Sequence, residues 1–421
     1  MQVSSFKFQI SGFRMSIEST AVLEIGTSTV RVVVGELRAD GVVSVIGIGE
    51  AESRGIRKGE IINRDHAIAS LRAALKAAEE NRRKSIHSVL LITSGGQSES
   101  KTSTGILKLV YPEDNQLSEI NVDDIDEIVD LARKVALPES RIKLHTLQQY
   151  FQIDDLFDVT SPIGMTGEEL RLDMLTIHGK RSTVDNFRKI VDDAPIDCSD
   201  AVFSGLCSAL AVLNDEQKKA GVLVVDIGGG TTDFVLYHDG LVQTAASFAV
   251  GGEHVTNDIA IGLKIPSGQA EHVKLRDGSA LTNLMERDHN ISIPAQQGFP
   301  GKMVRAVTLN TIINARMEEI FMLVKEHIDQ HCPNVPMSAG VLLTGGGAFL
   351  NGARDLGQKV FNEPCSYGKP RDVQGLPSAK DAPRYAAHVG CIRYAASLQA
   401  AEEKPALGEK LKKLFWGGSH E

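Results

Sequence analysis

The sequence predicts an α/β protein of more than one domain, and the prediction depends on three stretches that share one pattern. Residues 21–37, 221–237 and 339–361 each contain an apolar, β-branched strand followed by a tight turn of Gly, Thr or Ser. In the first two stretches a second apolar strand follows directly, which predicts a β-hairpin whose loop projects backbone amides. In the third, apolar residues at helical spacing follow, which predicts a strand, a turn and a helix. A chain of 421 residues has room for two or more domains and a large core.

Composition excludes several classes of protein. The content of 42% hydrophobic and 24% charged residues is that of an ordinary globular protein. A formal net charge of −9 argues against nucleic acid as a partner, because duplex binding requires a clustered basic surface. No apolar run approaches the ~18 residues of a transmembrane helix. Residues 1–19 make a poor signal peptide, and Met15 is an alternative start. The five cysteines are scattered and form no CxxC pair, so we expect free thiols in a reducing cytoplasm and no zinc site.

The glycine turns have the composition of an anion-binding site. Glycine has no Cβ, so successive N–H groups can converge on a phosphate, and a neighbouring Thr or Ser adds a hydroxyl donor. Glu24 and Asp226 occupy equivalent positions just before the two hairpin loops. Two carboxylates beside a phosphate group suit a hydrated Mg²⁺, which keeps most of its waters and takes few protein ligands directly. One such turn alone is more often an ordinary hairpin, but three in this order make a stronger prediction.

These motifs resemble those of the actin, sugar-kinase and heat-shock-70 ATPase superfamily. DIGGGTTDF at 226–234 is similar to its second phosphate motif, EIGTSTVRVVVGE at 24–36 to its first, and LLTGGGAFLNG at 342–352 to its adenosine motif. The Walker A pattern is missing, as is a strand–GxGxxG–helix unit with a downstream acidic residue. The resemblance implies an actin-like α/β fold of two lobes, formed by duplicated ribonuclease-H-like domains, that binds ATP and Mg²⁺.

Matching the motifs residue by residue implies a set of ligand contacts. Glu24 and Asp226 are implied to hold Mg²⁺ through water. AEHVKLRDGSA at 270–280 resembles the stretch that reaches the ribose and adenine, and GGEHVTNDIAIGL at 251–263 resembles the second connecting helix. The residues implied to bind the nucleotide are Gly26, Thr27, Ser28, Asp226, Gly228, Gly229, Gly230, Thr231, Thr232, Gly251, Gly252, Glu271, Lys274, Gly345, Gly346, Gly347 and Ala348.

Within the superfamily the chain resembles the bacterial cell-division family FtsA. SRGIRKGEIIN at 53–63 is typical of that family, and residues 101–177 have the length and position of its inserted subdomain, called 1C. The resemblance covers about residues 20–398 and extends to the tail. It implies an N-terminal extension (1–19), lobe 1 (20–100 and 178–220), the 1C insert (101–177), lobe 2 (221–250 and 306–378) with a smaller subdomain (251–305), a helix returning to lobe 1 (379–398), a linker (399–406) and an amphipathic tail (407–421).

The C-terminal segment LGEKLKKLFWGGSHE is both basic and apolar. On a helix, Leu407, Leu411, Leu414 and Phe415 share one narrow face, and Trp416 ends the segment. From the residues alone, a terminal helix docked on its own domain remains an alternative to a helix lying on a membrane surface. FtsA proteins end in such a membrane-targeting helix, so the resemblance favours the second interpretation. The residues expected at an anionic membrane surface are Leu407, Lys410, Leu411, Lys413, Leu414, Phe415 and Trp416.

One position departs from active members of the superfamily. They carry Gln or Glu on the first connecting helix, where it orients the attacking water, and the matching stretch VFSGLCSALAVL places Ser204 there. Phosphoryl transfer depends on positioning and electrostatics, and a serine is short and a poor base. We therefore expect ATP to be bound and hydrolysed slowly or not at all.

The resemblance also implies partners and a location. FtsA binds the C-terminal peptide of FtsZ near a basic residue before a long helix, which makes Lys302, Arg305 and Arg316 candidates, although each equally fits a solvated surface charge. Filament formation, other division proteins and the cytoplasmic face of the inner membrane at the division site are implied as well. A PilM-like pilus-assembly protein is the alternative, but it does not explain SRGIRKG or the tail. A small-molecule kinase of the superfamily has no use for the tail.

Overall fold

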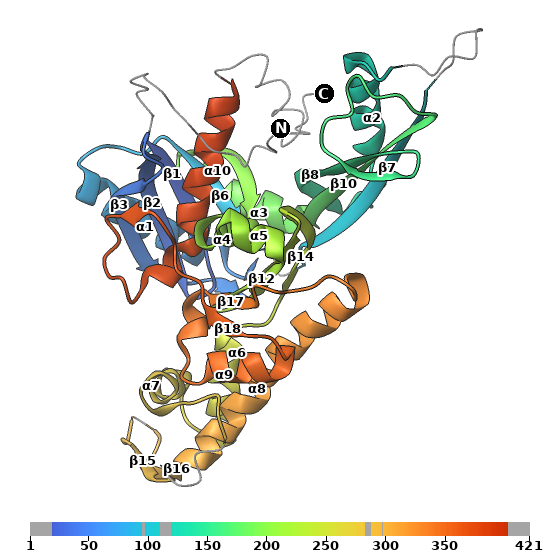
Figure 1. The fold of residues 1–421 in the computed structure, drawn as a ribbon. Coiled ribbons are helices and arrows are strands. Elements are labelled where there is room, and N and C mark those ends of the chain that lie inside the picture. Colours follow the sequence, from blue (N-terminus) through green and yellow to red (C-terminus); the bar gives the residue numbers. More distant parts are fainter. Residues whose placement is uncertain (1–18, 95–96, 110–118, 283–287, 297, 403–421) are drawn as a thin grey trace.

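Two large β-sheets form the framework of the computed structural model, which describes residues 19–94, 97–109, 119–282, 288–296 and 298–402 (Figure 1). The first sheet belongs to lobe 1 and mixes parallel and antiparallel neighbours. Its strands, in spatial order, are β11 (Asp197–Phe203), β6 (Ser88–Thr93), β1 (Thr20–Ile25), β2 (Thr29–Leu37), β3 (Val43–Glu52) and β19 (Val373–Gln374). A separate small hairpin joins β4 (Ile56–Arg57) to β5 (Glu60–Ile61).

Alternating side chains bury both faces of the first sheet. Val22 and Val33 point to the core beneath α4 (Ser204–Val212) and α10 (Ala386–Glu402). Leu23 and Val32 point to the other core, beneath α1 (Arg64–Arg82) and α3 (Arg181–Asp192). Strands buried on both faces are rich in β-branched residues, as this stretch of the sequence is. The predicted apolar face of α1 is confirmed, since Ile68, Leu71, Leu75 and Ala78 are buried.

The second sheet continues from lobe 2 into the insert. Its strands, in spatial order, are β18 (Cys365–Tyr367), β17 (Val341–Thr344), β12 (Val222–Ile227), β13 (Thr232–His238), β14 (Leu241–Phe248), β7 (Glu99–Lys108), β10 (Glu169–Lys180), β8 (Arg141–Ile153) and β9 (Leu156–Val159). The junction is the pairing of Ala246 on β14 with Glu99 on β7. The hydroxyl of Ser100 reinforces it by accepting a hydrogen bond from Ala245 N at 2.9 Å. The sequence did not predict that the insert would extend the lobe 2 sheet.

The insert has a core of its own. Helix α2 (Val122–Ala132) begins with a capping box between Asn121 and Asp124 and buries Ile128 and Val129 against strands β7, β8 and β10. Gly105 on β7 lets α2 approach closely, because a Cβ there would lie 2.7 Å from Ala132 N. The insert stands beside lobe 1, at the opposite end of the molecule from the β15–β16 hairpin of lobe 2 (Figure 1).

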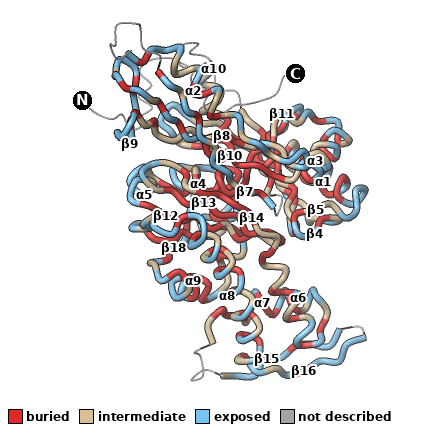
Figure 2. The backbone as a smooth tube through the Cα atoms, turned by 90° about the vertical axis from the view of Figure 1, so that its right-hand side faces the viewer, coloured by how far each residue is buried: buried red, intermediate tan, exposed pale blue. Residues whose placement is uncertain are grey.

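The helices of lobe 2 pack on one side of β12, β13 and β17. They are α6 (Gly252–Leu263), α7 (Ser267–Asp277), α8 (Ala306–His331) and α9 (Ala353–Phe361), with the hairpin β15 (Asn290–Ile293) and β16 (Lys302–Arg305) at their far end (Figure 2). One continuous core joins the segment 251–305 to the lobe 2 strands. The short helix α5 (Asp215–Ala220) connects α4 to β12.

The end of the described chain differs from the prediction. Helix α10 continues through Glu402, so helical structure extends into the segment 399–406 that was predicted to be a linker. The Ala-rich sequence of this segment favours helix, and it contains no glycine or proline before Pro405. The predicted extension up to residue 18 and the predicted tail 407–421 lie outside the described residues. Among the helices that the structure describes, none has the length and apolar content to cross a bilayer.

Candidate functional site: two facing hairpin turns

The two β-hairpins predicted within residues 21–37 and 221–237 are confirmed, and they share one construction. Strands β1 and β2 pair up to Ile25 and Val30, and β12 and β13 pair up to Ile227 and Thr232. In each turn the first glycine N–H donates to the carbonyl three residues later, Gly26 to Thr29 at 3.1 Å and Gly228 to Thr231 at 2.9 Å. The same local geometry therefore recurs in the two lobes, as expected for a duplicated fold.

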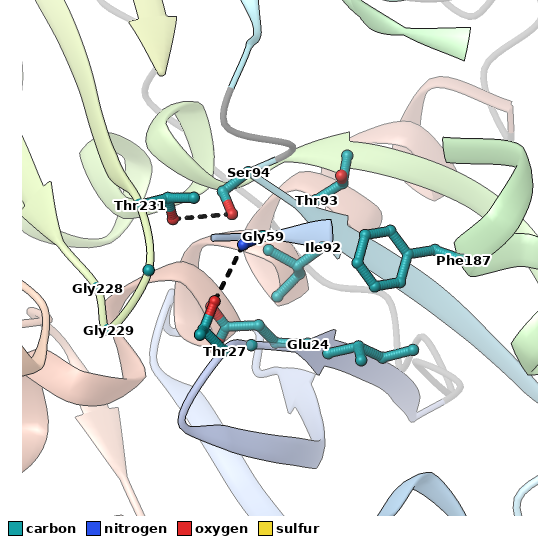
Figure 3. A pocket seen from close by; sticks show the side chains of 13 residues that line it. Glu24, Thr27, Gly59, Ile92, Thr93, Ser94, Phe187, Gly228, Gly229 and Thr231 are labelled. Carbon is teal, nitrogen blue, oxygen red and sulfur yellow. Dashed lines mark hydrogen bonds between the residues drawn. The ribbon is translucent and has the colours of Figure 1, made fainter. Parts of the chain in front are cut away.

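The two turns lie directly against each other. A Cβ on Gly229 would approach Ser28 Oγ to 2.1 Å, and one on Gly230 would approach Thr27 Oγ1 to 2.2 Å. A side chain at either position would have to displace the facing hydroxyl of lobe 1, and at Gly230 it would also crowd Thr27 Cβ at 2.8 Å, so both positions favour glycine. A small cavity remains beside this contact, and Figure 3 shows its side chains. It is lined by Glu24, Ile25, Gly26, Thr27, Gly59, Ile92, Thr93, Ser94, Phe187, Gly228, Gly229, Gly230 and Thr231.

Hydroxyl groups connect the turns to their surroundings. Thr231 Oγ1 donates to Ser94 Oγ at 3.1 Å, and Thr27 Oγ1 accepts from Gly59 N at 3.1 Å (Figure 3). Ser28 Oγ donates to the Glu253 carboxylate at 3.1 Å, which joins the first hairpin to the start of α6. Lobe 1 and lobe 2 thus meet through short polar contacts at the predicted phosphate site.

The two predicted metal carboxylates lie together at the base of the turns. Burial raises the pKa of Glu24 to about 7, with the charges of Arg31 and Asp226 acting in opposite directions. Burial raises the pKa of Asp226 to about 6, although a hydrogen bond from Ser208 opposes the shift. A nearby cation would stabilise the ionised form of both carboxyl groups and lower their pKa values. Among the described residues, no group of three or more His, Cys, Asp or Glu side chains could hold a metal. Water and phosphate oxygens would therefore have to complete a magnesium shell.

The third motif abuts the second. Strand β17 pairs in parallel with β12, and the 3₁₀ turn Gly346–Phe349 follows it. Gly345 has φ +80°, and a Cβ there would lie 2.1 Å from Asp226 Oδ1, so only glycine fits. A Cβ on Gly346 would meet nothing within 4 Å, so the backbone is open at this point. Thr344 Oγ1 and Gly345 N both donate to the carbonyl of Pro383, in the 3₁₀ turn Ala382–Tyr385 before α10.

Glu271 and Lys274, predicted to reach ribose and adenine, lie on α7 beside the start of α6. Lys274 Nζ contacts Glu271 Oε2 at 2.7 Å and donates to Thr256 Oγ1 at 2.8 Å. It also donates to the carbonyl of Gly252 at 3.1 Å, which brings the pair next to the predicted Gly251–Gly252 contact. The structure therefore gathers these predicted residues on the lobe 2 side of the same site.

Some of the residues predicted to contact the nucleotide are buried or hydrogen-bonded within the protein itself. Thr232 is fully buried, and its hydroxyl donates to the carbonyl of Val250 at 2.8 Å. Ala348 is buried within the third motif. The N–H groups of Gly252 and Glu253 donate to the carbonyls of Gly228 and Gly229, so the α6 N-terminus holds the second hairpin. Nucleotide contact by these residues remains a prediction.

Four residues of the site were not predicted from the sequence. They are Ser94, Ser208, Glu253 and His388, which contact Thr231, Asp226, Ser28 and Glu24 respectively. The glycine turn after the strand HSVLLITSGG was a signal for Ser94. Ser208 lies one helical turn beyond Ser204, so helical spacing was a signal for it. Glu253 and His388 had no local signal.

The three basic residues predicted to bind a partner are already engaged. Lys302 Nζ donates to the carbonyls of Leu263 and Lys264, and Arg305 pairs with Asp288. Arg316 pairs with Asp258 at 2.6 Å and with Glu319 at 2.6 Å. An acidic peptide would have to compete with these internal carboxylates. Partner binding by these residues remains a prediction.

We expect Glu24→Gln to stabilise the ligand-free protein at alkaline pH. The folded-state pKa of Glu24 is raised, so folding favours the protonated form; stability is full below pH ~4.5 and is lost as pH rises through about 7. The glutamine amide of the variant does not ionise, so the variant does not lose this stability as the pH rises. Because the Glu24 side chain is 26% exposed, the gain at pH 8 should be at most about 3 kcal/mol. Thermal unfolding at pH 5 and pH 8 measures it.

The control for this variant is Glu52→Gln, since the Glu52 side chain is 73% exposed on the same lobe. We expect Glu52→Gln to unfold like the unaltered chain at both pH values. A Glu24→Gln protein that is no more stable than the unaltered chain at pH 8 would show that ionised Glu24 is adequately solvated or paired with Arg31.

Solved structures share this architecture at low sequence identity. The PilM–PilN type IV pilus biogenesis complex aligns with a TM-score of 0.59 and 15% identity, over 89% of this chain and 98% of that chain. MreB5 of Spiroplasma citri bound to ADP aligns with a TM-score of 0.53 and 15% identity, over 92% of this chain and 99% of that chain. The two lobes with their facing hairpins therefore define an actin-like fold, as the sequence predicted.

Family membership follows from closer relatives. The pattern for "Cell division protein FtsA" matches residues 223–390, and that for "SHS2 domain inserted in FTSA" matches residues 95–178. The cell division protein FtsA of Pseudomonas aeruginosa is 33% identical over 378 residues, covering 90% of this chain and 89% of the relative. FtsA of Escherichia coli K12 is 30% identical, covering 88% of this chain and 89% of the relative. The chain belongs to the FtsA family of actin-like cell division proteins.

Proposed function

We propose that this chain binds ATP with Mg²⁺ between its lobes, forms filaments, and tethers the FtsZ ring to the inner face of the cytoplasmic membrane at the division site. The observation that carries the nucleotide part is the convergence of Glu24 and Asp226 beneath two facing glycine turns from different lobes. Family membership supports the role in division, and FtsZ and other division proteins are the partners that it implies. The structure of MreB5 bound to ADP shows that a protein of the same fold takes an adenine nucleotide.

The residues of the site fit this ligand. The glycine turns offer backbone amides, Thr27, Ser28 and Thr231 offer hydroxyls, and Gly346 leaves the third motif open to a base or ribose. Glu24 and Asp226 would hold the water shell of Mg²⁺, and the ion would neutralise phosphate charge. Because Ser28 touches Gly229, a phosphate entering between the hairpins separates the two lobes locally. Nucleotide binding is thereby linked to the relative position of the lobes.

Hydrolysis is proposed to be slow or absent. Ser204 is the first residue of α4, is 3% exposed, and lies beside Asp233, whose pKa is raised by burial and by the charge of Asp226. A short buried hydroxyl there is a weak group for orienting an attacking water. Phosphate release by the unaltered protein with Mg²⁺ and ATP tests this part, and turnover near ~1 to 10³ per second would contradict it.

The membrane part of the proposal is supported by the sequence of the tail, since residues 407–421 lie outside the described structure. Burying its few apolar side chains in the membrane surface contributes a few kcal/mol of binding free energy, at ~25 cal/mol per Å² of apolar area. The cost of ordering the helix reduces this contribution. Its lysines add about 1 kcal/mol each at most on an anionic surface. A single copy should therefore bind reversibly, and many copies in one filament should bind firmly through effective concentration.

Liposome co-sedimentation tests the tether. We expect the full-length protein to bind anionic vesicles. The bound fraction should rise steeply with protein concentration and fall as the salt concentration increases. The Leu411→Glu, Phe415→Glu double variant and a chain lacking residues 407–421 should stay in solution. Glu409→Gln, on the polar face, is the matched control and should still bind. Equal sedimentation of all these proteins would mean that the tail is a packed terminal helix.

A further inference from the structure

His388 is a buried polar residue that the mechanism so far leaves without a task. It lies in the first turn of α10 and is fully buried, and neither of its ring nitrogens has a hydrogen-bond partner of good geometry. A buried polar group without a partner costs roughly 1–3 kcal/mol, so its presence calls for a reason. The carboxylate contact that the structure records for His388 is with a residue of the predicted metal site.

That residue is Glu24, whose carboxylate oxygen Oε2 lies 3.5 Å from His388 Nε2. Arg31 Nη1 lies 3.9 Å from the same oxygen, on the neighbouring strand β2. The guanidinium of Arg31 is otherwise held by Glu50, which also accepts a hydrogen bond from Tyr385 at 2.8 Å. A neutral imidazole has one N–H to donate, and the Glu24 carboxylate can accept it.

The backbone around His388 fixes it relative to all three motifs. The carbonyl of Pro383, just before α10, accepts hydrogen bonds from Thr344 and Gly345 of the third motif. Further along α10, Gly390 packs so tightly on α4 that a Cβ there would lie 1.7 Å from the carbonyl oxygen of Cys207. The adjacent residue of α4, Ser208, donates to Asp226. The α4–α10 pair thus presents one side chain to each acidic residue, Ser208 to Asp226 and His388 to Glu24.

We propose that His388 is a positioning residue of the magnesium site. With the ion in place, its Nε2–H, which lies 3.5 Å from Glu24 Oε2 in this structure, would donate to that oxygen and hold the carboxylate toward Asp226, so that both carboxylates can share the water shell of one ion. The inference rests on the proposed binding of ATP with Mg²⁺. Without this restraint the terminal torsion of the Glu24 side chain is free to rotate, and only some of its rotamers place the carboxylate against the water shell of the ion. The residue should therefore affect Mg²⁺-dependent affinity and leave binding of metal-free ATP unchanged.

Calorimetric titration of ATP, with Mg²⁺ and with EDTA, tests the proposal on the full chain. In His388→Leu, which keeps the bulk and removes the donor, the Mg²⁺-dependent gain in ATP affinity should fall by about 10- to 100-fold. In His388→Gln, whose Nε2–H can reach the same oxygen, the gain should stay within about threefold of the unaltered chain. Affinity in EDTA should be the same in all three proteins.

Several outcomes would overturn the proposal. One is a Mg²⁺-dependent gain in ATP affinity that is undiminished in His388→Leu, and another is a loss of that gain in His388→Gln as large as in His388→Leu. A third is a loss of affinity that also appears in EDTA, which would mean that His388 acts only through its packing. If His388→Leu does not fold, His388→Asn replaces it, because its shorter amide falls short of Glu24 and should lose the gain that Gln keeps. An unaltered chain that binds no ATP would instead refute the proposed function, and the inference with it. On a Glu24→Gln background, His388→Leu should have no further effect.

Discussion

Asp226→Ala is expected to lower the affinity for ATP in the presence of Mg²⁺ by at least ~30-fold while the fold is retained. Asp226 is the penultimate residue of strand β12, two residues before the second glycine turn, and its carboxylate is the lobe 2 contribution to the proposed metal site. Removing a buried charge that pairs with a cation costs about 2–5 kcal/mol, and every 1.4 kcal/mol is about tenfold in affinity. The fold should survive because burial already disfavours the ionised carboxylate, whose pKa is about 6. Calorimetry measures the affinity, and circular dichroism checks the fold.

The control and a second variant sharpen this test. Glu216→Ala removes an exposed carboxylate from the nearby helix α5 and should leave the affinity unchanged. Gly229→Val should also abolish binding, because a side chain there collides with Ser28 across the gap where phosphate must enter. Unchanged affinity in both Asp226→Ala and Gly229→Val would refute the nucleotide site while leaving the actin-like fold intact.

The parts of the fold that the sequence predicted are local in the chain. The hairpin at 221–237 was predictable because β-branched residues flank a glycine turn within a single short stretch. The apolar face of α1 was also predictable, because its apolar residues recur at helical spacing within one short stretch. The end of α10 was predicted too early because residues 399–402 continue helix-forming sequence, and the segment was interpreted from the family pattern instead.

The parts of the site that the sequence did not predict are contacts between distant segments. His388 stands in a helix that is buried on nearly all sides, and Glu253 lies in the first turn of α6. Their neighbours in the sequence give no indication that they face Glu24 and Ser28. The junction of β7 with β14 likewise joins distant segments, through the pairing of Ala246 with Glu99 and a hydrogen bond from Ser247 N to the carbonyl of Ser98 at 2.8 Å. Sequence periodicity determines which face of an element is buried, but it does not determine which other element covers that face.

Gly390→Ala is expected to destabilise the protein by about 2–3 kcal/mol, although alanine is the better helix former. Gly390 lies inside α10, where its missing side chain lets α10 rest on the backbone of α4. An added Cβ would lie 1.7 Å from the carbonyl oxygen of Cys207, and a backbone atom cannot rotate away as a side chain can. The helices must therefore separate, and overpacking of this kind costs about 1–3 kcal/mol or more. Thermal and urea unfolding measure the loss.

Gly268→Ala is the matched control, because it makes the same chemical change in a helix where nothing is crowded. Gly268 lies near the start of α7, and a Cβ there would meet no atom within 4 Å. Alanine should therefore stabilise the protein by a few tenths to about 1 kcal/mol, opposite in sign to Gly390→Ala. If α4 and α10 together position Asp226 and Glu24, Gly390→Ala should also weaken Mg²⁺-dependent ATP binding at a temperature where it is folded, and Gly268→Ala should not. A Gly390→Ala protein as stable as the unaltered chain would show that α10 can shift away from α4 at little cost, so that the close contact is not required for the fold.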